Sequence, residues 1–370
     1  MNFLYLIWNG SPEIIKIGIF SLRWYGLLFA LGFLISQQLL YYIHRKEGKP
    51  EKDVETLTIY MVIATILGAR LGHVIFYQPE MLWQSPLEVL LPIEFEPKFR
   101  ITGYLGLASH GGAIGILFAL WLYSRKNKPG QSYLQVLDRI VILVALTGAM
   151  IRTGNFFNSE ILGRPTDSSL GIAFVSRVTE VFMQDSDKML DDIVIKKNET
   201  MPDGADGRKP ILIYLFFKPG LFSGSAHNYV NTNVQWYLGK MPDFIDRSGA
   251  AYLDYQLIED KEGHQVAVIK TYAIARHPAQ LYEAISCFLL FLLLFGIWMR
   301  YKENLPPGLI FGWFMVILWS LRFGYEYLKE NQVDFETKLP LNMGQILSIP
   351  LVLVGVVILW RVYVKKEVKP

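Results

Sequence analysis

Gly148–Asp167 reads GAMIRTGNFFNSEILGRPTD, and an apolar run, Ile140–Ala149, leads directly into it. The polar residues that follow this run within a few positions are Arg152, Asn155, Asn158 and Glu160. Ionisable groups at membrane depth are costly, so such a cluster indicates a functional site. Gly154 and Gly163 bracket the cluster, and glycine lets the backbone approach a ligand or turn sharply. The alternative is a polar helix end at the level of the lipid headgroups.

Composition points to a membrane protein with several spans. The 370 residues are 52% hydrophobic and 19% charged, with a mean hydropathy of +0.28, whereas soluble domains are usually less apolar and more charged. The net charge is only +3. A single cysteine, Cys287, excludes an internal disulfide framework. No cleavable signal peptide is evident, so we expect the first apolar run to act as both signal and first span.

Seven apolar segments are about 20 residues long, which is enough to cross a bilayer. They are Ile19–Ile43, Leu57–Tyr77, Ile101–Tyr123, Tyr133–Met150, Gln280–Met299, Gly308–Tyr327 and Gly344–Val364. Basic clusters follow the first, third, fifth and seventh spans, namely His44–Lys49, Arg125–Lys128, Arg300–Lys302 and Lys365–Lys369. By the positive-inside rule these clusters are cytoplasmic and the N-terminus lies outside.

The polar connection between spans four and five is too long to be a structureless loop. Three of its segments have the β-branched and aromatic content of strands, namely Gly171–Phe182, Ile211–Phe217 and Gln265–Tyr272. Asp203–Gly207 is typical of a turn or a disordered loop tip. We therefore expect a small, β-rich, outward-facing insertion.

The predicted fold class is an all-α polytopic membrane protein with seven transmembrane helices, an external N-terminus and a cytoplasmic C-terminus. The predicted domains are a transmembrane core with spans one to four (1–163), the extracytoplasmic insertion (164–276) and a transmembrane core with spans five to seven (277–370).

Span two carries Arg70, His73 and Tyr77 at helical spacing on one face. Gly68 and Gly72 form a small-xxx-small pattern that suits close helix packing. A packing helix with His73 and Tyr77 at the outer interface explains those two residues as well as a functional site does, but it explains Arg70 less well.

Span three contains His110, which two glycines, Gly111 and Gly112, follow directly. Glycine at these positions lets a backbone or a headgroup approach the imidazole. A neutral histidine is a natural general base for a thiol, although a purely structural histidine is equally consistent with this pattern. In span one, Tyr25 is either a residue of the aromatic interface belt or an inward-facing hydroxyl at a site.

Charged residues also mark the start of span five and the end of span six. RHPAQLYE, Arg276–Glu283, opens span five, and Glu283 is unusual so near the membrane. The alternative is an interfacial cap in which Arg276 pairs with a carboxylate. Arg322 and Glu326 lie four residues apart and can pair on one face of span six, either in a structural ion pair or in a site.

Several catalytic motifs are absent from the sequence, including GxSxG, HExxH and a run of acidic ligands for a phosphate-bound metal. Cys287 lies among apolar residues and is most simply a buried apolar side chain, not a nucleophile. What remains is a set of arginines, histidines, amides and a carboxylate near the outer ends of the spans. This set suits a lipid that carries a phosphate, because arginine pairs with phosphate and stabilises charge that develops on it.

Six motifs resemble, in order, those of the prolipoprotein diacylglyceryl transferase family. They are GARLGHVIFY, HGGAIG, GAMIRTGNFFNSEILGR, RHPAQLYEA, RFGYE and NMGQILSIP. The resemblance extends from about Arg23 to Val364 and leaves out most of the insertion. It implies an enzyme of the bacterial plasma membrane that transfers diacylglycerol from phosphatidylglycerol to the lipobox cysteine of a prolipoprotein. The products are a thioether and glycerol phosphate.

The resemblance also implies roles for individual residues. The catalytic residues would be His110, as a candidate base, and Arg152 and Arg322, which would hold the phosphate. Substrate-binding residues would be Tyr25, Arg70, Asn155, Glu160, Gly163 and Glu326. The expected partners are phosphatidylglycerol, the prolipoprotein signal peptide with its lipobox cysteine and membrane lipids. No metal, cofactor or nucleic acid is expected.

Two regions differ from the family pattern. YLKENQVDFE, which follows Glu326, lacks the expected arginine and proline-aspartate, so no family role is assigned beyond Glu326. The insertion 172–270 is longer than the family core requires. Either it shapes entry of the prolipoprotein or interacts with other envelope proteins, or it is a tolerated surface addition. The rival functions are a lipid transporter, for which inverted repeats are missing, and a non-enzymatic assembly protein for envelope lipoproteins.

Overall fold

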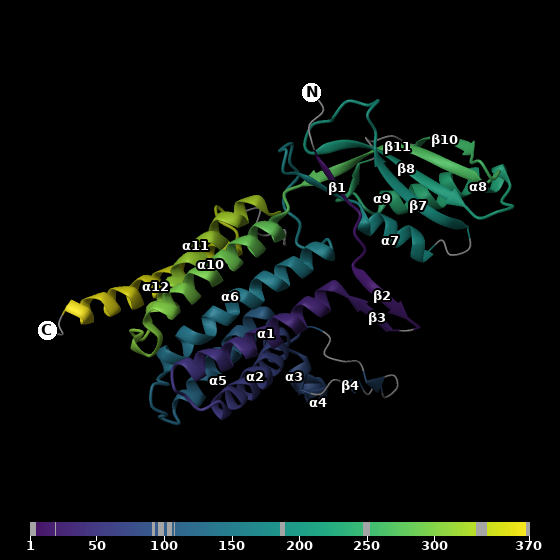
Figure 1. The fold of residues 1–370 in the computed structure, drawn as a ribbon. Coiled ribbons are helices and arrows are strands. Elements are labelled where there is room, and N and C mark those ends of the chain that lie inside the picture. The colour runs from purple at the N-terminus through teal and green to yellow at the C-terminus, as the bar shows by residue number, and fades with distance from the viewer. Residues whose placement is uncertain are drawn as a thin grey trace. The chain divides into compact units, whose positions relative to one another are not determined.

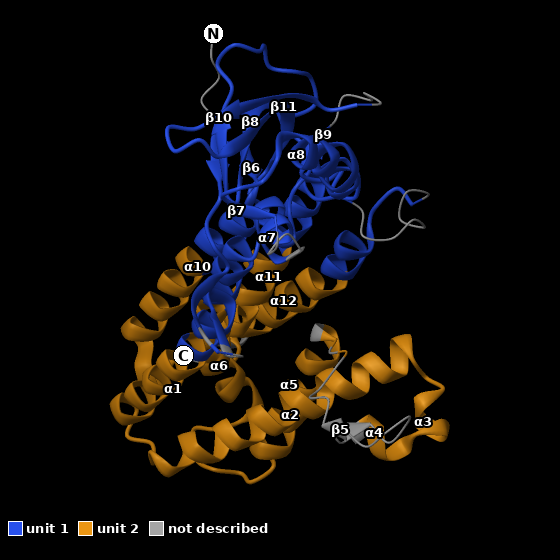
Figure 2. Cartoon of the chain, turned by 90° about the vertical axis from the view of Figure 1, so that its right-hand side faces the viewer, with its two compact units in different colours: residues 1–31, 148–287, 320–349 blue, residues 32–147, 288–319, 350–370 orange. Residues whose placement is uncertain are grey.

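The computed structural model describes residues 5–18, 20–90, 93–94, 100–101, 106, 108–185, 189–246, 252–330 and 339–367. The chain divides into two compact units (Figure 2). Unit 1 comprises residues 1–31, 148–287 and 320–349, and unit 2 comprises residues 32–147, 288–319 and 350–370. No finding tests the predicted domain boundaries at 164 and 276, and they stay a prediction.

Within the described ranges, six helices are long and apolar enough to cross a bilayer (Figure 1). They are α1 (Trp24–Lys46), α2 (Lys52–Tyr77), α6 (Tyr133–Phe157), α10 (Ala279–Tyr301), α11 (Leu309–Tyr325) and α12 (Met343–Glu367). Short 3-10 turns, η2 (Lys302–Asn304) and η3 (Glu326–Leu328), extend α10 and α11. The apolar helix α5 (Ser109–Ser124) has 16 residues and rises only about 24 Å, so it is shorter than a full span.

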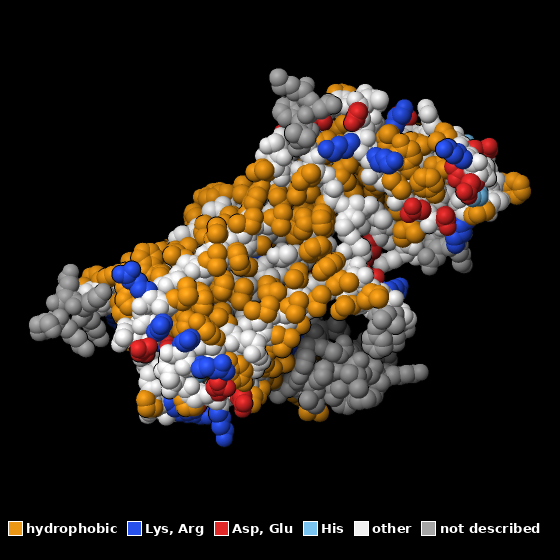
Figure 3. All heavy atoms as spheres, in the orientation of Figure 1, with side chains coloured by type: hydrophobic (Ala, Val, Ile, Leu, Met, Phe, Trp, Pro, Cys, Tyr) orange, Lys and Arg blue, Asp and Glu red, His pale blue; other side chains and the backbone are white. Residues whose placement is uncertain are grey.

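The helices present apolar side chains to their surroundings. Leu34, Ile63, Leu289 and Leu353 are each more than half exposed. Figure 3 shows hydrophobic side chains across the face of the helices, with charged side chains gathered at helix ends. Such a surface is unfavourable in water and suits lipid, which supports the membrane assignment. The interior helix is α6, in which 61% of the apolar window is buried, against 17% in α12.

Glycine lets α2 and α5 pack with their backbones in contact. A Cβ built on Gly72 lies 2.6 Å from Cα of Gly111, and one built on Gly68 lies 2.6 Å from the carbonyl oxygen of Gly111. No larger side chain fits this crossing without moving a helix. The small-xxx-small packing predicted for span two is therefore confirmed, and the glycines of α5 that meet it are Gly111 and Gly115.

A buried carboxylate caps α11 within unit 2. Asp138 of α6 has no exposed surface and accepts hydrogen bonds from the backbone N–H groups of Gly308 (2.7 Å) and Phe311 (2.8 Å). These N–H groups have no partner inside their own helix, so the carboxylate satisfies donors that would otherwise be buried and unpaired.

The insertion contributes six strands to a seven-stranded sheet, whose seventh strand, β1, comes from the N-terminal segment; the order is β1-β6-β11-β8-β7, with β9 and β10 also paired to β11. The strands are β1 (Leu6–Trp8), β6 (Ile172–Phe174), β7 (Leu190–Lys197), β8 (Arg208–Phe217), β9 (Ile245–Asp246), β10 (Asp254–Glu259) and β11 (Gln265–Arg276). The helices of this region are α7 (Ser176–Asp185), α8 (Ser223–Tyr229), the π-helix η1 (Val230–Val234) and α9 (Gln235–Gly239). One hydrophobic core includes apolar residues of the strands and of these helices, among them Ile213, Phe182 and Val234. The β-rich content predicted for the insertion is confirmed.

Strands β8 and β11 confirm two of the predicted strand segments, and Asp206 and Gly207 have positive φ in the predicted turn. The strand predicted within Gly171–Phe182 is wrong beyond Phe174, because β6 ends there and α7 follows it. Val178 and Phe182 are both fully buried and lie four residues apart, a spacing that is typical of a helix and not of a strand.

Two span starts are also wrong. Phe20–Arg23 is strand β3, which pairs with β2 (Glu13–Ile17), so α1 begins at Trp24; the predicted start, Ile19, lies outside the described residues. Ile101 lies in β5 (Arg100–Ile101), which pairs with β4 (Ile93–Glu94), and α5 begins only at Ser109. Between α2 and β4 lie two short helices, α3 (Met81–Gln84) and α4 (Pro86–Leu90).

Candidate functional site

The C-terminal turn of α6 and the loop after it carry the polar residues of the opening motif, all in unit 1. Asn155 is 5% exposed, and its side-chain amide donates to Oε2 of Glu160 at 3.2 Å. The amide of Asn158 donates to Oε1 of the same carboxylate at 3.3 Å. Ser159 and Ile161 have φ values of 53° and 54°, a region that a β-branched residue such as isoleucine rarely adopts. Local strain of this kind is concentrated at functional sites.

Arg152 begins a series of ion pairs that we call the charge chain, which consists of Arg152, Glu283, Lys329, Glu326 and Arg322. Nε of Arg152 lies 2.6 Å from Oε2 of Glu283, and the other oxygen of Glu283 pairs with Nζ of Lys329. The same ammonium lies 3.5 Å from Glu326, and Glu326 lies 3.9 Å from Arg322. The charge chain joins α6, α10, α11 and the segment after α11, and every member belongs to unit 1.

Burial and charge are unevenly distributed along the charge chain. The side chains of Lys329, Glu283 and Glu326 are 6%, 10% and 11% exposed, whereas that of Arg322 is 41% exposed. The charge chain contains three cations and two carboxylates. Cationic groups in a partly buried site attract an anion strongly, because water screens them little.

Unsatisfied acceptors lie close to this cluster. Gln280 is 1% exposed, and its amide N–H donates to the backbone carbonyl of Glu160. In the part of the chain that the structure describes, Oε1 of Gln280 and Oδ1 of Asn158 are buried without a hydrogen-bond partner. A buried acceptor without a donor is costly, so these two oxygens mark positions where a ligand hydroxyl would be favourable.

The start of α12 supports Glu326. Asn342 donates to Oε2 of Glu326 at 3.3 Å, and the backbone N–H of Gln345 donates to Asn342 Oδ1 at 2.9 Å. A Cβ built on Gly344 lies only 2.5 Å from the carboxyl carbon of Glu326. The NMGQ motif therefore supplies both a donor and the space that the carboxylate occupies.

Gly163 lies where three backbone segments converge. Its N–H donates to the carbonyl of His277 at 3.0 Å, and its carbonyl accepts from Arg276 at 3.1 Å. An added Cβ would lie 2.6 Å from the oxygen of His277 and 2.9 Å from that of Leu328. The contacts observed for Gly163 are thus packing contacts. Burial lowers the pKa of His277, which favours its neutral imidazole.

Arg276 pairs with carboxylates, as the structural alternative for this residue predicted. It lies 2.8 Å from a carboxylate oxygen of Glu330 and 3.4 Å from one of Asp243. At 4% exposure, Arg276 holds the last strand of the sheet to the segment that follows α11. Its charge is therefore committed to structure.

Tyr25 lies in the first turn of α1 and packs against α6 at Gly154. A Cβ on Gly154 would lie 3.0 Å from Cα of Tyr25, so glycine sets this approach. The neighbouring rings of Trp24 and Phe157 stack at 4.8 Å. Unit 1 thus contains Tyr25, Arg152, Asn155, Glu160, Gly163, Arg322 and Glu326 of the predicted site.

Arg70 and His110, the other two predicted residues, belong to unit 2. Arg70 is 7% exposed and donates to the backbone carbonyls of Val89 (3.1 Å) and Glu88 (2.9 Å), so it holds α4 against α2. His110 is exposed, and its ring makes a T-shaped contact with the ring of Phe76, at 5.0 Å between centroids.

Two members of the charge chain, Glu283 and Lys329, were not among the predicted site residues. Glu283 stood out as a carboxylate near the membrane, but its partner was not apparent. Lys329 lies in the segment that departs from the family pattern. The signal that could have found it is its position three residues after Glu326, which places both on one face of a helical turn. The described residues include no cluster of three or more histidine, cysteine or acidic side chains arranged to hold a metal.

Comparison with known proteins gives a full-length match. Residues 12–361 match the protein family described as prolipoprotein diacylglyceryl transferase. The phosphatidylglycerol–prolipoprotein diacylglyceryl transferase of Bacteroides fragilis is 32% identical over 364 residues, which cover 98% of this chain and 97% of the relative. The enzymes of the same description from Tolumonas auensis and Chloroherpeton thalassium are each 31% identical, over 96% of this chain and 96% and 94% of their own lengths.

Proposed function

The chain belongs to the prolipoprotein diacylglyceryl transferase family, and from that premise we propose that the charge chain of unit 1 is its catalytic centre. The protein is a multi-pass enzyme of the bacterial inner membrane. It transfers the diacylglyceryl group of phosphatidylglycerol to the lipobox cysteine of a prolipoprotein, the first step of lipoprotein maturation.

The reaction requires a cationic site for its leaving group. The cysteine sulfur attacks the glycerol carbon that bears the phosphate, a C–S bond forms and the C–O bond breaks. The electron pair of that bond leaves on the phosphate oxygen as glycerol phosphate, and the thiol proton passes to a base. Negative charge therefore grows on the phosphate in the transition state, and fixed cations stabilise it without reorganising.

The observation that carries this proposal is that the charge chain brings two arginines, Arg152 and Arg322, into one partly buried cluster of unit 1. The phosphodiester of the lipid is the anion that such arginines bind. We assign phosphate binding to Arg152 and Arg322, whose guanidinium groups pair well with phosphate oxygens. Glu283 and Lys329 fix the position of Arg152, and Glu326 fixes that of Arg322.

The glycerol hydroxyls of the headgroup suit the two unsatisfied acceptors. Oε1 of Gln280 and Oδ1 of Asn158 are buried and each can accept one O–H. We propose that Asn155 and Glu160 orient this polar loop, and that Tyr25 closes the same region beside Gly154.

The thiol still needs a base, because a free cysteine has a pKa of about 8.5. We propose His110 for this role, and its exposed imidazole at the start of α5 is compatible with it. For Arg70 we propose a supporting role, since its hydrogen bonds go to the backbone of α4. We further propose that the N-terminus and the insertion 164–276 face outward, as the four basic clusters of the sequence indicate.

The function is tested with purified protein in detergent, phosphatidylglycerol and a peptide that carries a lipobox cysteine. The expected product is a peptide with a diacylglyceryl thioether, detected by mass spectrometry. Arg152→Ala and Arg322→Ala should each lower kcat by about 100-fold or more, because each removes a charge that stabilises the leaving group. The matched control is Arg177→Ala, an exposed arginine of the insertion, which should keep normal turnover.

Each result bears on a distinct part of the proposal. No thioether product from the unmodified protein, with phosphatidylglycerol binding intact, would contradict the transferase activity. Near-normal turnover in either arginine variant would remove that arginine from the mechanism.

A further inference from the structure

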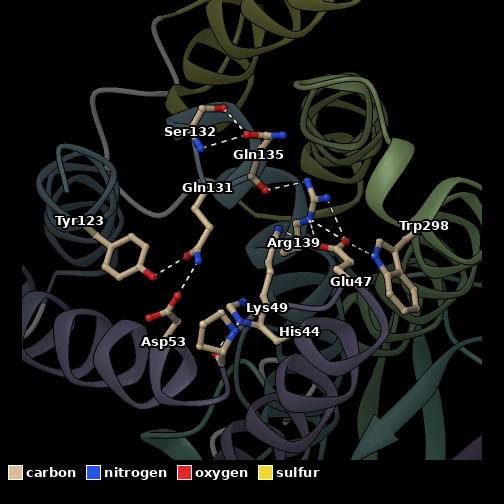
Figure 4. A network of polar contacts seen from close by, with 11 residues as sticks. His44, Glu47, Lys49, Asp53, Tyr123, Gln131, Ser132, Gln135, Arg139 and Trp298 are labelled. Atoms are coloured by element: carbon tan, nitrogen blue, oxygen red, sulfur yellow. Dashed lines mark hydrogen bonds and ion pairs between the residues drawn. The ribbon is translucent and has the colours of Figure 1, made fainter. Parts of the chain in front are cut away.

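Unit 2 contains a cavity of about 630 Å³ that the mechanism above does not use. It lies between the loop that joins α1 to α2 and the loop that joins α5 to α6. Its charged lining residues are Glu47, Lys49, Asp53, Lys128, Arg139 and Glu303. Figure 4 shows the polar network at this position, with side chains from several helices directed toward one another.

One buried carboxylate in this network serves two cations. The side chain of Glu47 has no exposed surface, and its Oε1 lies 2.9 Å from Nη2 of Arg139. Its Oε2 lies 2.6 Å from Nζ of Lys49, and Trp298 donates to Oε1 at 2.7 Å. The side chains of Arg139 and Lys49 are only 3% and 11% exposed. Two largely buried cations therefore share one negative charge.

The rest of the lining does not correct this imbalance. Lys128 pairs with Asp53, which also accepts from Gln131 at 2.6 Å, so this pair is neutral overall. Glu303 lies in the exposed turn η2 at the rim, so it is not part of the buried lining, and water weakens its charge without removing it. The buried part of the cavity therefore has an excess of one positive charge.

The pKa shifts of the two buried partners agree with an excess of cations. Burial and the nearby Arg139 both lower the pKa of Lys49. Burial alone would raise the pKa of Glu47, but Arg139 and Lys49 outweigh it and hold that pKa below its ordinary value. Both shifts describe a site in which one more anion would be stabilised.

We infer that this cavity binds a phosphate group, held by Lys49 and Arg139 with Lys128 beside them. A guanidinium and an ammonium in one partly enclosed space match the oxygens of a phosphate. The cavity opens where basic clusters follow the first and third predicted spans, at the level of a lipid headgroup layer. The phosphate belongs either to the headgroup of a membrane lipid or to a soluble phosphate ester.

The binding test uses the full-length protein in an uncharged detergent, titrated with inorganic phosphate at constant ionic strength and followed by thermal unfolding. Lys49→Gln should weaken the apparent phosphate affinity by about tenfold, because a charge-assisted contact is lost. Glu303→Gln should strengthen it several-fold, because a repelling charge leaves the rim. The control, Lys46→Gln, removes an exposed lysine that does not line the cavity.

Phosphate binding at the charge chain is distinguished from binding in the cavity by repeating the titration in an Arg322→Gln background. This substitution leaves the residues of unit 2 unchanged. If Lys49→Gln fails to fold, Glu303→Gln decides the question, because its side chain is exposed. An affinity that Glu303→Gln leaves unchanged, or that Lys49→Gln and Lys46→Gln change equally, would overturn the inference.

A second arm identifies the source of the phosphate. The protein is placed in nanodiscs of phosphatidylcholine with phosphatidylserine, and retained lipids are counted by native mass spectrometry. One fewer phosphatidylserine in Lys49→Gln than in Lys46→Gln would support a lipid headgroup. Equal lipid retention with the phosphate effects intact would support a soluble phosphate ester. Equal retention without any phosphate effect would contradict the site.

Discussion

At the scale of single residues, Lys329 connects the candidate site to the rest of unit 1. It is 5% exposed and pairs with both Glu283 and Glu326, and Glu283 in turn pairs with Arg152. Replacing one member of a buried ion pair leaves its partner charged and desolvated, which is why such changes are costly even when the intact pair contributes little net stability.

Lys329→Met should therefore lower the free energy of unfolding by about 3–5 kcal/mol. Lys329→Arg keeps the charge and should restore most of that stability. Unfolding in detergent, followed by intrinsic fluorescence, measures both variants beside Lys261→Met, which removes an exposed lysine of the insertion. A Lys329→Met protein as stable as Lys261→Met would show that the buried pairs do not matter for folding.

At the scale of elements, glycines decide how closely segments approach. Gly68 and Gly72 set the crossing of α2 with α5, Gly154 sets the approach of α1 to α6, and Gly163 lies between the backbones of His277 and Leu328. In each case the obstacle to a larger residue is backbone or a helix neighbour, which cannot simply rotate away.

Gly163→Ala should destabilise the protein by about 1–3 kcal/mol, because a Cβ there meets two backbone carbonyl oxygens. Gly296→Ala is the matched control, since nothing lies within 4 Å of its Cβ position in α10. That control should be neutral or stabilised by up to about 1 kcal/mol from helix propensity. The midpoint temperature of thermal unfolding should fall in Gly163→Ala and should stay unchanged or rise in Gly296→Ala. Equal midpoints in the two variants would contradict the packing role of Gly163.

At the scale of the whole molecule, the chain combines lipid-facing helices with a polar, β-rich insertion. The exposed side chains of the helices are apolar and suit lipid, whereas the insertion has its own hydrophobic core and a charged surface. Which side of the membrane the insertion faces depends on the distribution of basic residues in the connecting loops.

The predicted topology is tested with single cysteines in a Cys287→Ala background. Lys261→Cys, in the insertion, should react with a membrane-impermeant maleimide added to intact cells stripped of their outer membrane. Lys126→Cys, in the loop after α5, should react only after the inner membrane is permeabilised. The reverse pattern would place the insertion in the cytoplasm.

The sequence alone determined the membrane class, the β-rich insertion, the Arg322–Glu326 pair and the family. These depend on local features, such as runs of about 20 apolar residues, short spacings and ordered motifs. The sequence did not reveal where α1 and α5 begin. A short apolar segment has a similar composition in a strand and in a helix, and it is too short for its periodicity to distinguish them.

Only the tertiary structure showed that Arg152 pairs with Glu283 and Glu283 with Lys329, and that Gly163 is a packing position. The same holds for the two cations that share Glu47. These contacts join residues that are far apart in the chain, and each side chain alone is consistent with an ordinary interfacial charge. The pairing becomes visible only when helices from different parts of the sequence pack together, since burial then makes every unpaired charge costly.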